Sequence, residues 1–188
     1  MKNLVYLLLG ALFFGGCSYK NESISLESYK ADYNGAIAKE NTSVYVTAVK
    51  DMRSDKKNIG YTLKNGKKDL LLFSDADFAK KYKEGLGYGL SIAEFNTNVS
   101  QNDADVLLEI RIKKIELVYH DKSFDENLKG EIEIEVVVKK GRTTSTQNFK
   151  EKAGKWIAPS YSSKDIEPFL YTLFSDSINN IISKLASK

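Results

Sequence analysis

Two neighbouring stretches of the chain alternate apolar and polar side chains, and this alternation constrains the fold more than any other feature. The second stretch, LKGEIEIEVVVKK over residues 128–140, places aliphatic side chains at every second position from Ile132 on, with Glu131, Glu133 and Glu135 between them. Successive side chains of a β-strand point to opposite faces of the sheet. The pattern therefore predicts a strand with one buried face and one solvated face.

The first stretch, DVLLEIRIKKIELVYHD over residues 105–121, changes phase partway along. Its apolar positions are even-numbered before Lys113 and odd-numbered after Lys114. A shift of one residue would turn the second half of a regular strand inside out. We therefore predict a β-bulge at Lys113-Lys114, because the extra residue returns the apolar set to the core side.

Shorter elements are predicted on either side. Residues 43–51, SVYVTAVKD, alternate and are rich in β-branched side chains, which is typical of a strand. Ile59 to Phe73 is predicted to be a hairpin, because the Asn65-Gly66 pair suits the positive φ angles of a type I′ turn. Residues 142–152 indicate a polar, edge-like strand.

Two helices complete the expected order. Ser74 is a candidate cap for a helix whose apolar residues recur every four positions, at Phe78, Tyr82, Leu86 and Leu90. A last helix opens at Ser162 or Ser163 and keeps a 3.6-residue period to Leu185. The sequence predicts an α+β fold, a two-layer sandwich with two helices packed on one face of a mostly antiparallel sheet.

The N-terminus has the pattern of an export signal. Lys2 precedes an apolar run from Leu4 to Phe14, which is shorter than the roughly 20 residues that a membrane span needs. Gly15 and Gly16 then lead into Cys17, the only cysteine of the chain. We expect residues 1–16 to be a signal peptide removed between Gly16 and Cys17.

Cys17 resembles the lipobox cysteine of bacterial lipoproteins, whose thiol is acylated and becomes the new N-terminus. Several acyl chains would hold the protein stably, because each buried methylene contributes about 0.8 kcal/mol. We expect residues 17–42 to be the lipidated cysteine and a polar tether, and residues 43–188 to form one α+β domain.

The block VYVTAVKDMRSDKKNIGY, the helix after Ser74 and the strand opening ADVLLEI together resemble the YajG family of bacterial lipoproteins. The block contains Asp51, Arg53, Asp55 and the pair Gly60-Tyr61. The resemblance implies an outer-membrane lipoprotein with a periplasm-facing domain, and it implies no catalysis. Ser18, after Cys17, resembles the sorting pattern for the outer membrane.

Asp51, Arg53 and Asp55 are candidate contacts for a partner, because a guanidinium fork binds carboxylates. The alternative, which we favour, is a local ion pair that orders the loop. Trp156 and Tyr161 are either ligand contacts or a plug that packs their loop onto the sheet. Residues 142–152 are either an acceptor for a partner strand or an ordinary charged edge.

Composition limits the chemistry. One His and one Cys exclude a Cys/His zinc site and a conventional Cys-His catalytic pair. His120 beside Asp121 is expected to form a solvated turn, and the three glutamates are expected to mark the solvent side of their strand. A net charge of +3 gives no electrostatic footprint for nucleic acid. We expect no catalysis, cofactor, metal or nucleic-acid binding.

These observations predict a non-enzymatic lipoprotein, anchored to the outer membrane through acyl groups on Cys17, whose periplasm-facing domain binds another envelope protein as an assembly accessory. Two alternatives stay open. One is a surface-exposed lipoprotein acting as an antigen or adhesin, and the other is a small-ligand or glycan binder that uses Trp156 and Tyr161.

Overall fold

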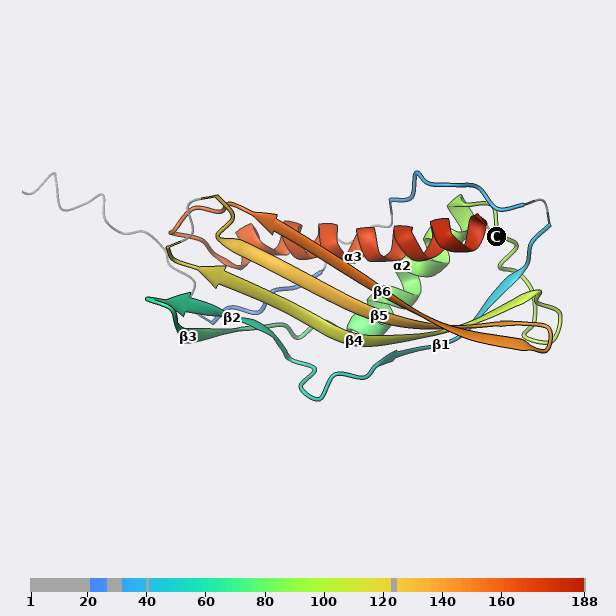
Figure 1. The fold of residues 1–188 in the computed structure, drawn as a ribbon, viewed down its shortest axis with the longest axis horizontal. Helices are drawn as coiled ribbons and strands as arrows, with labels where there is room; N and C mark the ends of the chain where they lie inside the picture. The colour runs from blue at the N-terminus through green and yellow to red at the C-terminus, as the bar shows by residue number, and fades with distance from the viewer. Residues whose placement is uncertain (1–20, 27–31, 40, 123–124, 188) are drawn as a thin grey trace, which may run out of the picture.

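The computed structural model describes residues 21–26, 32–39, 41–122 and 125–187. It confirms the α+β fold, with one mixed sheet that does not close on itself and two helices (Figure 1). In chain order the elements are β1 (Val44–Asp51), β2 (Asn58–Lys64), β3 (Lys67–Phe73), α2 (Phe78–Ile92), β4 (Val106–His120), β5 (Leu128–Lys140), β6 (Thr143–Lys155) and α3 (Ser163–Ala186).

The long strand β4 organises the sheet. On one side it pairs antiparallel with β5, which pairs antiparallel with β6. On its other side, β1 pairs in parallel with the first half of β4 and β2 pairs in parallel with the second half. Strand β3 is antiparallel to β2. Three pairings are thus antiparallel and two are parallel.

The predicted bulge and hairpin are both confirmed. The pairing of β4 with β5 shifts register between Ile112 and Lys114, so that Ile112 and Ile115 are both buried. Strands β2 and β3 are joined by Asn65 at φ 52° and Gly66 at φ 77°, the left-handed backbone that a type I′ turn needs.

Both helices cover one face of the sheet (Figure 1). The ring of Tyr82 in α2 lies 5.0 Å from that of Phe174 in α3, edge to face, and the Tyr82 hydroxyl bonds Ser177. The expected cap Ser74 is wrong, because α2 begins later and Asp77 accepts from the Lys80 N–H at 3.0 Å. In α3, Ser162 and Asp165 form a capping box.

The expected tether is also corrected. Ile24, Leu26 and Tyr33 are buried in the core, and the Ile24 N–H donates to the carbonyl of Phe73 at 2.9 Å. The packed domain therefore begins before residue 43, by Ile24 at the latest. Isolated apolar residues in a polar stretch carry no period, and their burial shows only in the fold. Residues 1–16 and Cys17 lie outside the described residues.

Two described stretches before β1, residues 22–26 and 32–33, contact opposite ends of α3. Glu22 accepts from the Ser163 hydroxyl at 2.7 Å, and the Ser25 hydroxyl donates to Glu167 at 3.1 Å. Near the other end of the helix, the Asn179 amide donates to the carbonyl of Asp32 at 2.7 Å, and the hydroxyls of Tyr33 and Ser183 lie 3.3 Å apart. The chain therefore enters the fold at the N-terminus of α3.

Candidate functional site

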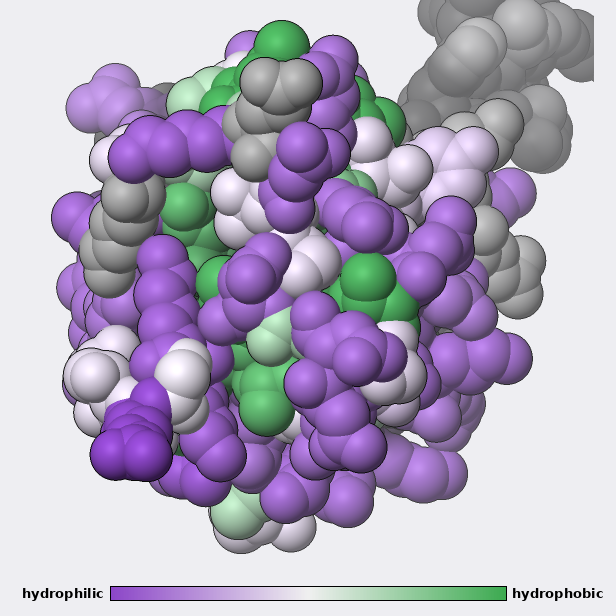
Figure 2. Space-filling model, turned by 90° about the vertical axis from the view of Figure 1, so that its right-hand side faces the viewer, coloured by the Kyte–Doolittle hydropathy of each residue, from purple (hydrophilic) through white to green (hydrophobic). Residues whose placement is uncertain are grey.

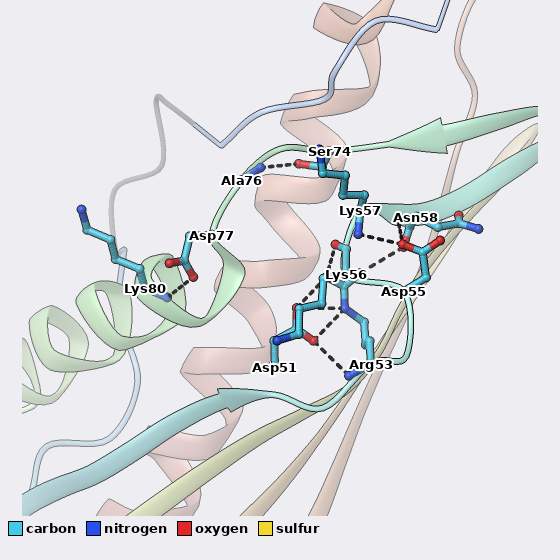
Figure 3. Close-up of polar contacts among 10 residues, drawn as sticks. All are labelled: Asp51, Arg53, Asp55, Lys56, Lys57, Asn58, Ser74, Ala76, Asp77 and Lys80. Carbon is cyan, nitrogen blue, oxygen red and sulfur yellow. Dashed lines mark hydrogen bonds and ion pairs between the residues drawn. The ribbon is translucent and has the colours of Figure 1, made fainter.

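Arg53 is buried in the loop after β1 and is fixed by its neighbours (Figure 3). Its Nη2 lies 2.7 Å from Oδ2 of Asp51 and its Nε lies 3.0 Å from Oδ1, and the two side chains are only 5% and 8% exposed. The guanidinium also donates to the carbonyls of Lys56 at 2.7 Å and Asn58 at 3.1 Å. Its centre lies 4.9 Å from the Phe78 ring. Arg53 thus holds the loop through contacts within the chain.

Asp55 has a similar local role. Its Oδ1 accepts from the backbone N–H groups of Lys57 at 3.0 Å and Asn58 at 3.1 Å. These bonds close the turn that leads into β2. The loop from Asp51 to Asn58 is therefore ordered by hydrogen bonds of the same residues that the sequence indicated as candidate contacts.

A hollow of about 540 Å³ lies beside this loop, between the end of β1 and the start of α2. We call it the β1–α2 groove. Its lining is Val49, Lys50, Asp51, Met52, Lys56, Ala76, Asp77, Phe78 and Ala79. Phe78 is buried, whereas the Met52 side chain is 52% exposed. An apolar floor is thus combined with charged groups at the rim.

The backbone next to the groove is an open edge. Among the described residues, β1 from Tyr45 to Asp51 pairs with β4 on one side and with no strand on the other. An unpaired edge can add a strand through main-chain hydrogen bonds, while a neighbouring pocket takes alternate side chains. A flexible, polarisable Met at such a place suits varied apolar contacts.

Sequence reasoning missed this groove. Met52 could have indicated an apolar surface here, because it is the one large apolar residue in the polar stretch MRSDKKN. Ala76 and Ala79 carry no sign of their own, since small residues at the start of a helix are ordinary.

The two aromatic candidates are separated by the structure. Tyr161 is buried, and its ring lies 4.2 Å from that of Tyr119, so it plugs the loop onto the sheet. Trp156 is 53% exposed. Between them, Ile157 is held by Asn127, whose side chain accepts from its N–H at 2.8 Å and donates to its carbonyl at 2.7 Å.

Strand β6 is a second open edge, as expected of residues 142–152, because in the described structure it pairs with β5 alone. Its second half is charged, with Lys150 and Lys152 bonded to Glu131 of β5. Its first half, Thr143 to Asn148, is neutral and mostly exposed.

The glutamates of β5 face the open side of the sheet and are paired with cations of the chain. Hydrogen bonds from Lys150 first, and then from Lys114 and Lys152, lower the pKa of Glu131 to about 2. Glu133 bonds Lys150, and Glu135 lies 2.8 Å from Arg111. Among the described residues, no group of three or more His, Cys, Asp or Glu side chains is arranged to hold a metal ion.

His120 and Asp121 order a turn. The Nδ1 of His120 accepts from the Lys122 N–H at 3.2 Å, and Asp121 accepts from the Asn65 N–H at 3.1 Å. The Asp121 carboxylate thus ties the end of β4 to the hairpin tip.

Comparison with known proteins gives a family and a fold. A family model described as "Uncharacterized lipoprotein" matches residues 32–184. No curated protein matches the chain. In the described part of the chain, neither helix combines the length and apolar character of a membrane span.

Two crystal structures are similar in fold. Protein XCC0632 from Xanthomonas campestris is 11% identical, with a TM-score of 0.58 over 88% of this chain and 92% of that one. An uncharacterized protein is 8% identical, with a TM-score of 0.50 over 87% of this chain and 99% of that one. At these identities the likeness concerns the fold alone.

Proposed function

The chain belongs to the YajG family of uncharacterized lipoproteins. We propose that it is a lipid-anchored envelope protein whose folded domain binds a partner protein. Cys17 carries the acyl groups after removal of residues 1–16. The resemblance of the N-terminus to outer-membrane lipoproteins supports an anchor in the outer membrane, with the domain on the periplasmic face.

The β1–α2 groove is the proposed binding site, and the observation that carries it is an apolar hollow of about 540 Å³ beside an unpaired strand edge. The partner supplies an extended segment that pairs with β1 and places an apolar side chain over Met52. Lys56 at the rim favours an acidic residue in that segment, whereas Lys50 is paired with Glu109 at 2.9 Å. Binding of this kind makes no use of catalysis, so the proposed role is an assembly accessory.

The lipid anchor is tested with Cys17→Ala. We expect the wild-type protein to fractionate with membranes and the variant to be soluble after export, because the variant has no thiol to acylate. Membrane fractionation followed by immunoblotting measures this. Protease added to intact and to permeabilised cells then reports the face, and digestion in intact cells would favour the surface-exposed antigen or adhesin.

The groove is tested by placing a photo-reactive amino acid at Met52. We expect irradiation of cells to give a covalent adduct, which mass spectrometry maps to an extended segment of one envelope protein. The matched control carries the same amino acid at Thr144, an exposed position on the other open edge. Ala79→Glu, which fills the groove floor with a charge, should remove the Met52 adduct. An adduct at Thr144 alone would assign partner binding to β6.

A further inference from the structure

The lipid and the folded domain are close together along the chain. Only four peptide bonds separate Cys17 from Asn21, and Glu22 already bonds Ser163 at the start of α3. Four residues span at most about 14 Å when fully extended. Helix α3 has 24 residues and is therefore roughly 36 Å long. We call the end of the domain with the start of α3 the near end, and the end with the last residues of α3 the far end. The short link to Cys17 holds the near end, and not the far end, at the membrane.

At the near end of the domain, four paired residues form a row across the sheet. Thr62 of β2 pairs with Tyr119 of β4, Tyr119 with Leu128 of β5, and Leu128 with Lys155 of β6. Neighbouring strands are about 4.8 Å apart, so the row is about 14 Å wide. Beyond it lie the β2–β3 hairpin tip on one side and the loop with Trp156 on the other (Figure 1).

Trp156 is held in an exposed position by its neighbours. Asn127 fixes the backbone of Ile157, and the contact of Tyr161 with Tyr119 fixes the rest of the loop. The Trp156 side chain stays 53% exposed. Tryptophan is enriched at membrane–water interfaces, because its ring is apolar and its N–H remains hydrated.

The hairpin tip supplies positive charge. Lys64 and Lys67 flank the Asn65-Gly66 turn, and both are exposed. Several acidic side chains at this end are bonded within the chain: Glu22 to Ser163, Asp121 to the Asn65 N–H and Asp165 to Ser162. These hydrogen bonds leave the carboxylates charged, so attraction to anionic headgroups is expected at the hairpin tip, where the two exposed lysines lie.

The opposite end has a different surface. Figure 2 looks onto it and shows hydrophobic side chains separated by hydrophilic ones. Lys139 and Lys140 lie beside the β5–β6 turn at this end, because Lys140 pairs with Val106, the first residue of β4.

We propose that the near end of the domain rests on an anionic bilayer, with Trp156 in the headgroup region and Lys64 and Lys67 against lipid phosphates. This orientation rests on the proposed acylation of Cys17. It leaves the far end turned away from the membrane.

The chain allows a direct test, because Trp156 is its only tryptophan and Cys17 its only cysteine. A maleimide phospholipid is coupled to Cys17 in the chain that starts at this residue. The protein is then placed on vesicles of phosphatidylcholine and phosphatidylglycerol with brominated acyl chains. We expect strong quenching of Trp156 fluorescence. In the matched variant Trp156→Phe with Tyr88→Trp, the probe lies on the part of α2 that packs near Ile182, and we expect several-fold weaker quenching.

A second pair of variants tests the charge. Lys64→Gln with Lys67→Gln should reduce the quenching of Trp156, whereas Lys139→Gln with Lys140→Gln should not. Equal quenching at the two tryptophan positions, while the protein stays on the vesicles, would overturn the orientation. Because the lipid is attached chemically, this result is independent of whether the cell acylates Cys17, which the Cys17→Ala fractionation measures separately.

Discussion

Replacing Arg53 with Met is expected to lower the free energy of unfolding by about 3–5 kcal/mol. The variant leaves the Asp51 carboxylate, 8% exposed, without its partner. It also removes the donors to the carbonyls of Lys56 and Asn58. Urea unfolding followed by circular dichroism measures the loss.

The matched control for this variant is Lys57→Met. Lys57 pairs with Asp75 at 3.0 Å, but the two side chains are 78% and 58% exposed, so water screens their attraction. We expect no measurable change in the free energy of unfolding. If both variants showed the same small loss of stability, the buried pair of Asp51 and Arg53 would not stabilise the loop.

Replacing Gly60 with Ala is expected to lower the free energy of unfolding by on the order of 3–5 kcal/mol. Gly60 has φ +148°, a backbone conformation that other residues rarely adopt, and a Cβ there would lie 1.8 Å from the carbonyl oxygen of Leu117. Because Gly60 pairs with Leu117, the clash can be relieved only by separating β2 from β4. Thermal unfolding should show a much lower midpoint.

Gly87→Ala serves as its control, because a Cβ at Gly87 in α2 meets no atom within 4 Å. Alanine is favoured over glycine inside helices by up to about 1 kcal/mol, so this variant should be slightly more stable than the wild type. A Gly60→Ala protein as stable as the wild type would contradict the close approach of β2 and β4.

The sequence predicted those parts of the fold that depend on local pattern. The change of phase at Lys113-Lys114 predicted the bulge, and Asn65-Gly66 predicted the hairpin. Alternation tells which face of a strand is buried, but it does not tell which strand lies beside it. The parallel placement of β1 and β2 along the same side of β4 was therefore out of reach.

The candidate site was predicted less well. Asp51, Arg53 and Asp55 drew attention by their charge, yet only Asp51 lines the groove. Arg53 and Asp55 order the loop beside it, and the apolar lining includes Val49 and Met52. Tyr161 and Trp156 look alike in sequence and differ in burial, because only Tyr161 has an aromatic ring opposite it on β4. Ile24 and Leu26 were missed because single apolar residues show no period.

The contacts of residues 22–25 and 32–33 with α3 also affect how the chain acquires its structure. Glu22 and Ser163 are 141 residues apart in sequence, and Tyr33 and Ser183 are 150 residues apart. In a chain that emerges N-terminus first, Glu22 and Tyr33 are therefore made long before the helix that they contact. Contacts between such distant residues form late and slowly. The complete core therefore requires the last helix of the polypeptide, because residues near both ends of the sequence contribute to it.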